Sequence, residues 1–134
     1  MVDIYTFEID SAEFERILSG KKTAQLVIND SKHKDYAVGN QITFKRDLAT
    51  INEEEQKLLE KEKLVVEVNA MVNNLLFFND FNEAINTLGK EGCGFKSSAT
   101  IEKTSDLFLS AESFEAVEKY GIMAIIFEPE LSKK

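Results

Sequence analysis

The sequence contains very few of the residues that build disulfides and metal sites. Its 134 residues include one cysteine, Cys93, and one histidine, His33. A lone cysteine cannot form an internal disulfide, and one histidine with one cysteine cannot complete a Cys/His zinc site. Cys93 lies between two glycines without a motif that indicates a nucleophile, and His33 lies between two lysines in a polar segment that indicates the surface. We therefore expect no metal, no other cofactor, and the reducing environment of the cytoplasm.

Long apolar runs are also missing. The longest, Ile122–Phe127, is far too short to cross a bilayer as a helix. The chain does not open with a basic segment followed by an apolar stretch, which is the pattern of a secretory signal. It has one proline, six glycines, 43% hydrophobic residues and 30% charged residues. This composition is typical of a single soluble globular domain, and we expect no contact with a membrane.

Basic residues are scarce relative to acidic ones. Sixteen lysines and arginines stand against 24 aspartates and glutamates, which gives a net charge of −8. Broad binding to nucleic-acid phosphates needs clustered basic residues, so this excess argues against it. Residues 16–46 nevertheless contain seven bases and two acids, whereas residues 1–15 contain five acids and no base. A basic segment in an acidic protein is compatible with an anionic ligand on one face, although ordinary scatter explains it equally well.

Hydrophobic periodicity predicts strands alternating with short helices. Alternating or continuous apolar patterns predict strands at residues 2–9, 23–28, 41–45, 64–72 and 122–127. The last is apolar throughout, which predicts an interior strand buried on both faces. Capping boxes of the form D-x-x-E begin predicted helices at Asp10 and Asp80, Ser110 begins a third, and glycines end them. This order indicates an α+β fold, a small twisted β-barrel with helices packed at its ends, as one domain over residues 1–134.

The same pattern predicts a single core and one insertion. The core is expected to unite Leu26, Ile42, Phe44, Val66, Val68, Ile125 and Phe127 with Phe14 and Ile17 of the first helix. Residues 47–63 are mostly charged, and Thr50-x-x-Glu53 is a capping signal for a short helix within them. We expect them to form a protruding, mobile insertion whose removal leaves the domain folded, because the cost of loop closure changes slowly with length.

Four stretches occur in an order that is typical of one domain family. Phe14–Thr23 reads F-E-R-I-L-S-G-K-K-T, and Tyr36–Phe44 places V-G-N before a strand. Asn79–Glu83 begins a helix after the long strand, and Ser110–Ala124 contains a helix, a Y-G turn and the start of the last strand. Together they resemble the signature of the ASCH domain, a PUA-like β-barrel, whose first elements are F-x-x-I-x-x-G-x-K-T and a V-G-D turn. The likeness covers nearly the whole chain except residues 47–63.

This resemblance implies a PUA-like barrel, a role in binding RNA and, in some small bacterial members, hydrolysis of an N4-acylated cytidine. The catalytic set of those enzymes is a Lys of the G-x-K-T element, a Thr two residues after the Thr of that element, and a distant Glu. Lys22 matches the Lys, but Gln25 stands at the position of the Thr and Val27 where an Arg is often found. Asn40 replaces the Asp of the V-G-D turn, and no Glu in residues 73–120 matches the catalytic carboxylate.

The residue chemistry indicates the same region. A helix that ends at Gly20 delivers Lys21 and Lys22 to the mouth of the domain, and strand alternation places Thr23 and Gln25 on one side. Lys donates to phosphate or carbonyl oxygens, and Gln offers both a donor and an acceptor to a base edge. The alternatives are a solvated charge at the helix C-terminus for Lys22, an exposed or packing position for Gln25, and a plain β-former for Thr23.

Three functions therefore stay open. The first is a module that binds RNA or a nucleoside-sized ligand in a cleft that contains Gln25 and is rimmed by Lys21, Lys22, Lys45 and Arg46. The second is an amidohydrolase in which Lys22 acts as nucleophile or base, assisted by Thr23 and an unidentified carboxylate; such a lysine needs a lowered pKa. The third is a protein-interaction module that docks through residues 47–63. The ligand and the oligomeric state are not fixed by the sequence.

Overall fold

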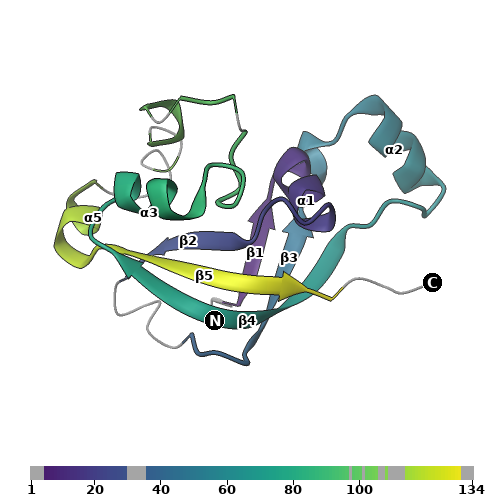
Figure 1. The fold of residues 1–134 in the computed structure, drawn as a ribbon. Helices are drawn as coiled ribbons and strands as arrows, with labels where there is room; N and C mark the ends of the chain where they lie inside the picture. The colour runs from purple at the N-terminus through teal and green to yellow at the C-terminus, as the bar shows by residue number, and fades with distance from the viewer. Residues whose placement is uncertain are drawn as a thin grey trace.

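A mixed, curved sheet of five strands forms a half-barrel (Figure 1). The computed structural model describes residues 5–29, 36–96, 98–100, 102–105, 108 and 114–130. The strands are β1 (Thr6–Ile9), β2 (Ala24–Ile28), β3 (Gln41–Arg46), β4 (Glu67–Phe78) and β5 (Ile122–Pro129), in the order β1-β3-β4-β5-β2. β1 and β3 are parallel, and the other neighbouring pairs are antiparallel. The α+β architecture and the small curved sheet agree with the sequence-based prediction.

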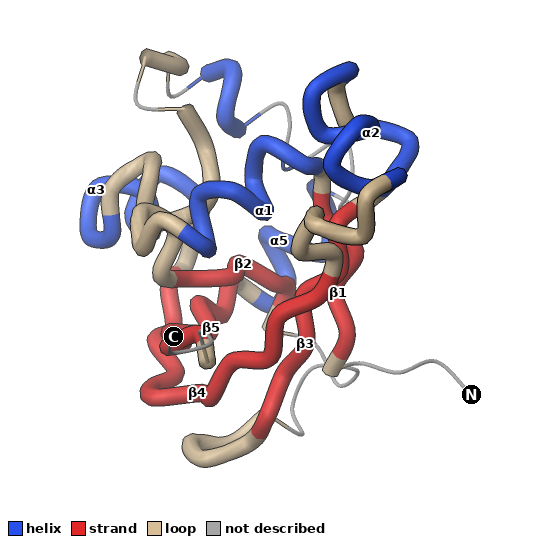
Figure 2. The backbone as a smooth tube through the Cα atoms, turned by 90° about the vertical axis from the view of Figure 1, so that its right-hand side faces the viewer, coloured by secondary structure: helices blue, strands red, loops and turns tan. Residues whose placement is uncertain are grey.

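Short helices connect and cover the strands. They are α1 (Ser11–Leu18), the 3₁₀ turn η2 (Leu48–Thr50), α2 (Glu53–Glu60), α3 (Phe81–Leu88) and α5 (Phe114–Tyr120). In the turned view of Figure 2, α1, α2 and α3 lie above the strands. None of the helices in the described part of the chain is long and apolar enough to cross a membrane.

The predicted helix caps are confirmed where the structure describes them. Asp10 and Asp80 accept hydrogen bonds from the backbone N–H groups three residues later, at 2.7 and 2.9 Å, and Gly89 ends α3. Residues 47–63 contain the expected short helix, but its N-cap is Asn52, which forms a capping box with Glu55. The expected cap at Ser110, the loop at residues 31–35 and the start of the first strand at residues 2–4 lie outside the described residues.

The long strand is shifted relative to its prediction. The alternating pattern predicted residues 64–72, whereas β4 begins at Glu67 and continues to Phe78. A register irregularity between Val72 and Asn74 interrupts its pairing with β5. A bulge of this kind changes the face to which the following side chains point, so the simple alternation ends there although the strand does not. Val66 lies before the strand and is 37% exposed.

The apolar residues form two cores, on opposite faces of β2 and β5. The first contains most of the predicted set, namely Phe14, Ile17, Ile42, Phe44, Val68, Ile125 and Phe127. Leu26 belongs instead to a second cluster, with Ile28, Ala124 and the α3 residues Phe81, Ala84 and Ile85. The prediction of one shared core is therefore wrong for Leu26 and for exposed Val66. Because successive residues of β5 supply both cores, residues 122–127 of this interior strand are all apolar, as the sequence indicated.

A buried arginine anchors the segment 47–63. The side chain of Arg46 is 1% exposed and donates to Ser11 Oγ, Glu55 Oε2 and Glu15 Oε2, each at 2.7 Å. Ser11 Oγ also donates to Glu55 Oε2 at 2.6 Å, and Arg46 Nε donates to the carbonyl of Val65 at 2.9 Å. α2 projects from the sheet, as expected (Figure 1), but Glu55 ties it to the body. Removal of the segment would take away Glu55 but leave Glu15 as a carboxylate partner for buried Arg46, so it should lower the stability, and the expectation that the domain still folds without these residues stays a prediction.

The role of Glu55 can be tested by Glu55→Gln. The glutamine oxygen can still accept from Asn52, but its amide nitrogen cannot accept from Ser11 and Arg46. We expect the free energy of unfolding in urea at pH 7 to fall by about 1–3 kcal/mol, the range for hydrogen bonds with a charged partner. Glu54→Gln is the matched control, because Glu54 is exposed in the same helical turn, and it should change the value by less than about 0.5 kcal/mol. Equal effects of the two substitutions would contradict the anchoring role.

The stability that Glu55 contributes should depend on pH. The hydrogen bond from Ser11, followed by the bond from the Asn52 backbone and the charge of Arg46, lowers the pKa of the Glu55 carboxyl, and burial opposes this. A carboxyl with a lower pKa in the folded state stabilises the protein above its unfolded pKa, about 4.3, and the stabilisation disappears as the pH falls through the folded pKa. The free energy of unfolding in urea should therefore differ less between the wild type and Glu55→Gln below about pH 4 than it does at pH 7.

Candidate functional site

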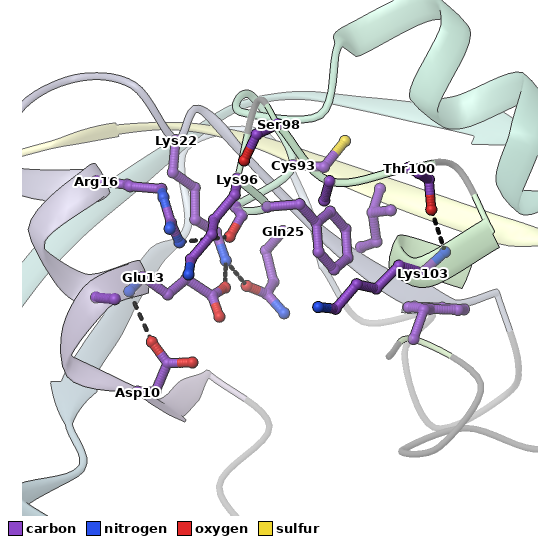
Figure 3. A pocket seen from close by; sticks show the side chains of 16 residues that line it. Asp10, Glu13, Arg16, Lys22, Gln25, Cys93, Lys96, Ser98, Thr100 and Lys103 are labelled. Carbon is purple, nitrogen blue, oxygen red and sulfur yellow. Dashed lines mark hydrogen bonds and ion pairs between the residues drawn. The ribbon is translucent and has the colours of Figure 1, made fainter. Parts of the chain in front are cut away.

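A cavity of about 700 Å³ opens between α1, the start of β2 and the segment that follows α3 (Figure 3). α1 contributes Glu13 and Arg16, the turn before β2 contributes Lys22, and β2 contributes Gln25. The wall opposite α1 comes from described residues between Cys93 and Phe108 and includes two aromatic side chains, Phe95 and Phe108. The volume lies within the range of 300–1,000 Å³ that is usual for small-ligand sites.

The floor of the cavity is organised by a buried lysine. Lys22 is 1% exposed, and its ammonium Nζ donates to Glu13 Oε2 and, at 2.6 Å, to Gln25 Oε1. The same ammonium lies 5.7 Å from the centre of the Phe44 ring. In the part of the chain that the structure describes, no buried side-chain polar atom lacks a hydrogen-bond partner. The cluster is therefore a satisfied polar network set into the first core, facing the cavity.

The end of α1 explains why Lys22 points inward. Gly20 adopts a positive φ of 81° directly after the helix, a conformation that favours glycine. The backbone N–H groups of Lys21 and Lys22 then both donate to the Arg16 carbonyl, at 2.8 and 2.9 Å. This turn leaves Lys21 exposed and directs Lys22 into the interior. The alternative that Lys22 is a solvated charge at the helix end is wrong.

A glycine permits the close approach of the opposite wall. Gly94 has a φ of 96°, and a Cβ atom there would lie 2.8 Å from Glu13 Oε2 and 2.9 Å from Lys22 Cδ. Arg16 Nη1 donates to the Gly94 carbonyl at 3.0 Å, which ties the wall to α1. Any larger residue at position 94 would therefore push the wall away from the ion pair.

Burial changes the acidity of two groups in the site. Desolvation lowers the pKa of Lys22, and the charge and hydrogen bond of Glu13 oppose this shift. Desolvation raises the pKa of the buried Cys93 thiol to about 11, with the charge of Lys22 acting in the opposite direction. Cys93 is therefore a protonated thiol at neutral pH and a poor nucleophile, whereas Lys22 is more easily deprotonated than an ordinary lysine.

The structure brings together only part of the residue set predicted from the sequence. Lys22 and Gln25 meet in the cavity, while Thr23 and Lys21 are exposed and do not line it. Lys45 is exposed, and its Nζ lies 3.8 Å from Glu67 Oε1. Arg46 points to the other face of β3, by strand alternation, and is buried in the network of Ser11 and Glu55. The prediction that four cations rim one cleft is therefore wrong.

The carboxylate that contacts Lys22 is Glu13. The D-x-x-E signal indicates only a helix cap for this residue, and the family resemblance points to residues 73–120 for a carboxylate. In the structure only the backbone N–H of Glu13 serves the cap, so its carboxylate is available to Lys22. The sequence signal for this contact is the spacing from Glu13 to the apolar Ile17, because residues four apart lie on the same face of a helix. Arg16, Lys96 and Lys103 were likewise missed as lining residues.

Among the described residues, no group of three or more His, Cys, Asp or Glu side chains is placed to hold a metal ion.

Comparisons with known proteins identify the fold but no family. No family model matches the chain, and no curated protein matches it. The crystal structure of hypothetical protein PH0355 is similar, with a TM-score of 0.66 and 18% identity over 93% of this chain and 97% of that one. The solution structure of protein PF0455 from Pyrococcus furiosus has a TM-score of 0.63 and 20% identity, over 95% and 99% of the two chains. The chain therefore shares its overall fold with these two proteins across nearly their full lengths.

Proposed function

We propose that the chain binds a nucleoside-sized ligand in the cavity above Lys22, Glu13 and Gln25. The observation that carries this proposal is the placement of a buried ammonium group at the floor of an open cavity. Burying a charge is costly even when it is paired, and the pKa of Lys22 is perturbed as a result. Perturbed ionisable groups in a cleft are concentrated at functional sites.

The orientation of Gln25 indicates the chemistry of the ligand. An ammonium group can only donate, so the Gln25 oxygen must face Lys22. The amide NH₂ then points the other way, and Figure 3 shows its nitrogen on the side of the cavity that faces Lys103. The floor therefore offers a hydrogen-bond donor suited to a carbonyl oxygen, and Phe95 and Phe108 offer apolar surface for a flat ring. Pyrimidine bases such as cytosine and uracil have both a carbonyl oxygen and a flat ring.

ASCH membership with a PUA-like barrel is part of this proposal. It is supported by the four sequence elements in order, by the small curved sheet, and by a cavity at the G-K-K-T element. A single nucleoside fits this cavity better than extended RNA does, because Lys22 and Arg46 are already occupied by carboxylates.

Binding can be tested by calorimetric titration with cytidine, uridine and N4-acetylcytidine. Gln25→Glu keeps the shape and the acceptor for Lys22 but replaces the NH₂ donor by a carboxylate oxygen. We expect it to weaken binding at least tenfold, which corresponds to about 1.4 kcal/mol for one lost hydrogen bond. Gln41→Glu, an exposed residue of β3, is the matched control and should bind as the wild type does. The proposal fails if none of the three nucleosides binds the wild type, or if Gln25→Glu binds equally well.

Hydrolysis of an N4-acylated cytidine is a second candidate function. The observation that favours it is the lowered pKa of Lys22 together with its contact to Glu13. Glu13 can take the proton that leaves Lys22 neutral, and the Lys22 amine can then take a proton from the water that attacks the acyl carbon, while the Gln25 NH₂ donates to the acyl oxygen. Lys22 can next give this proton to N4 of the cytidine as the C–N bond breaks, which releases cytidine and the free acid. Gln25 stands at the position of the Thr in the resembling enzymes.

Lys22→Arg separates hydrolysis from binding. Arg keeps the positive charge but is not deprotonated in proteins, so it cannot act as a base. If the chain is a hydrolase, the wild type should release cytidine from N4-acetylcytidine at a rate that rises with pH, and Lys22→Arg should reduce the rate by at least 100-fold, the usual contribution of a general base. Chromatography of the products measures both rates. Turnover that survives in Lys22→Arg would exclude Lys22 as the base.

A further inference from the structure

The cavity carries a charge opposite to that of the chain. The whole chain has a net charge of −8, yet the cavity is lined by four cations, Arg16, Lys22, Lys96 and Lys103, and by two carboxylates, Asp10 and Glu13. The cationic cavity attracts a small anion, whereas the acidic remainder of the protein repels a long polyanion. Its ligand is therefore expected to carry a negative charge of its own.

Two of the four cations are committed within the site. Lys22 is paired with Glu13 at the floor, and Arg16 donates to the Gly94 carbonyl. Lys96 and Lys103 form no side-chain hydrogen bond or ion pair with another described residue, and both are exposed. Figure 3 shows both side chains over the cavity, the Lys103 ammonium on the side of Gln25 that faces away from α1 and the Lys96 ammonium on the side of α1. The uncommitted positive charge thus lies at the mouth, above the polar floor.

We propose that the cavity takes a nucleoside in its phosphorylated form, with Lys96 and Lys103 holding the phosphate while Gln25 contacts the base. This inference rests on the proposed binding of a nucleoside. A phosphate monoester carries a charge of about −1.5 to −2 at pH 7, and lysine is a common point-charge partner for it. Two exposed lysines that line the cavity and have no carboxylate partner among the described residues supply the positive charge that one such group needs. The acidic remainder of the chain favours a free mononucleotide over a long nucleic acid.

The test compares each nucleoside with its own 5′-monophosphate by calorimetry at low salt, which isolates the phosphate from the base. We expect the monophosphates to bind about tenfold more tightly, which corresponds to about 1.4 kcal/mol. The double variant Lys96→Gln with Lys103→Gln should bind each nucleoside and its monophosphate about equally tightly. Lys57→Gln with Lys61→Gln is the control, because it makes the same change of net charge on the exposed α2 region and should keep the preference.

The outcomes separate this inference from the proposal beneath it. Nucleosides that bind in a Gln25-dependent way without any preference for the monophosphate overturn the phosphate site alone. A preference that survives in Lys96→Gln with Lys103→Gln, or that both double variants lose equally, overturns it as well. Absence of binding for every nucleoside and every monophosphate overturns both the phosphate site and the proposed function.

Discussion

The contact of the buried Lys22 ammonium with Glu13 is the constraint on which the site depends. A charge removed from water is tolerated only when its donors are satisfied, and Glu13 and Gln25 satisfy them here. The surrounding backbone follows from this need. Gly20 turns the chain so that Lys22 points inward, and Gly94 lets the opposite wall close over the ion pair. The backbone conformation at Gly20 and Gly94, on two sides of the cavity, is therefore the one that allows Lys22 to be buried against Glu13.

The helix α1 joins this site to the rest of the fold. One side of it holds Glu13 and Arg16, which face the cavity, while Ser11 and Glu15 bond to Arg46. Phe14 fills the core between them, with the Arg46 guanidinium 4.5 Å from the centre of its ring. Two buried cations thus fix a helix of only two turns, and Arg46 extends the connection to α2 through Glu55. A helix this short would be marginal without such tertiary contacts.

The sequence predicts what depends on neighbouring residues and misses what depends on distant ones. The caps at Asp10 and Asp80 and the apolar strand 122–127 are local signals, and the structure confirms them. The face of Leu26 depends on which helix covers β2, and the length of β4 depends on a bulge that breaks its alternation. In the site, Lys22 and Gln25 followed from the G-K-K-T element. Glu13 did not, because the fold decides which carboxylate meets Lys22.

The most direct test of this account is the pKa of Lys22 itself. Heteronuclear NMR of a ¹⁵N-lysine-labelled protein follows each Nζ through a pH titration, and Lys22→Arg identifies the resonance that belongs to Lys22. Burial lowers this pKa, so the Lys22 midpoint should lie below the ordinary lysine value of about 10.4. Glu13→Gln should lower it further, because the opposing charge is then lost. A Lys22 midpoint at or above the ordinary value, unchanged in Glu13→Gln, would show a solvated lysine and contradict the buried cluster.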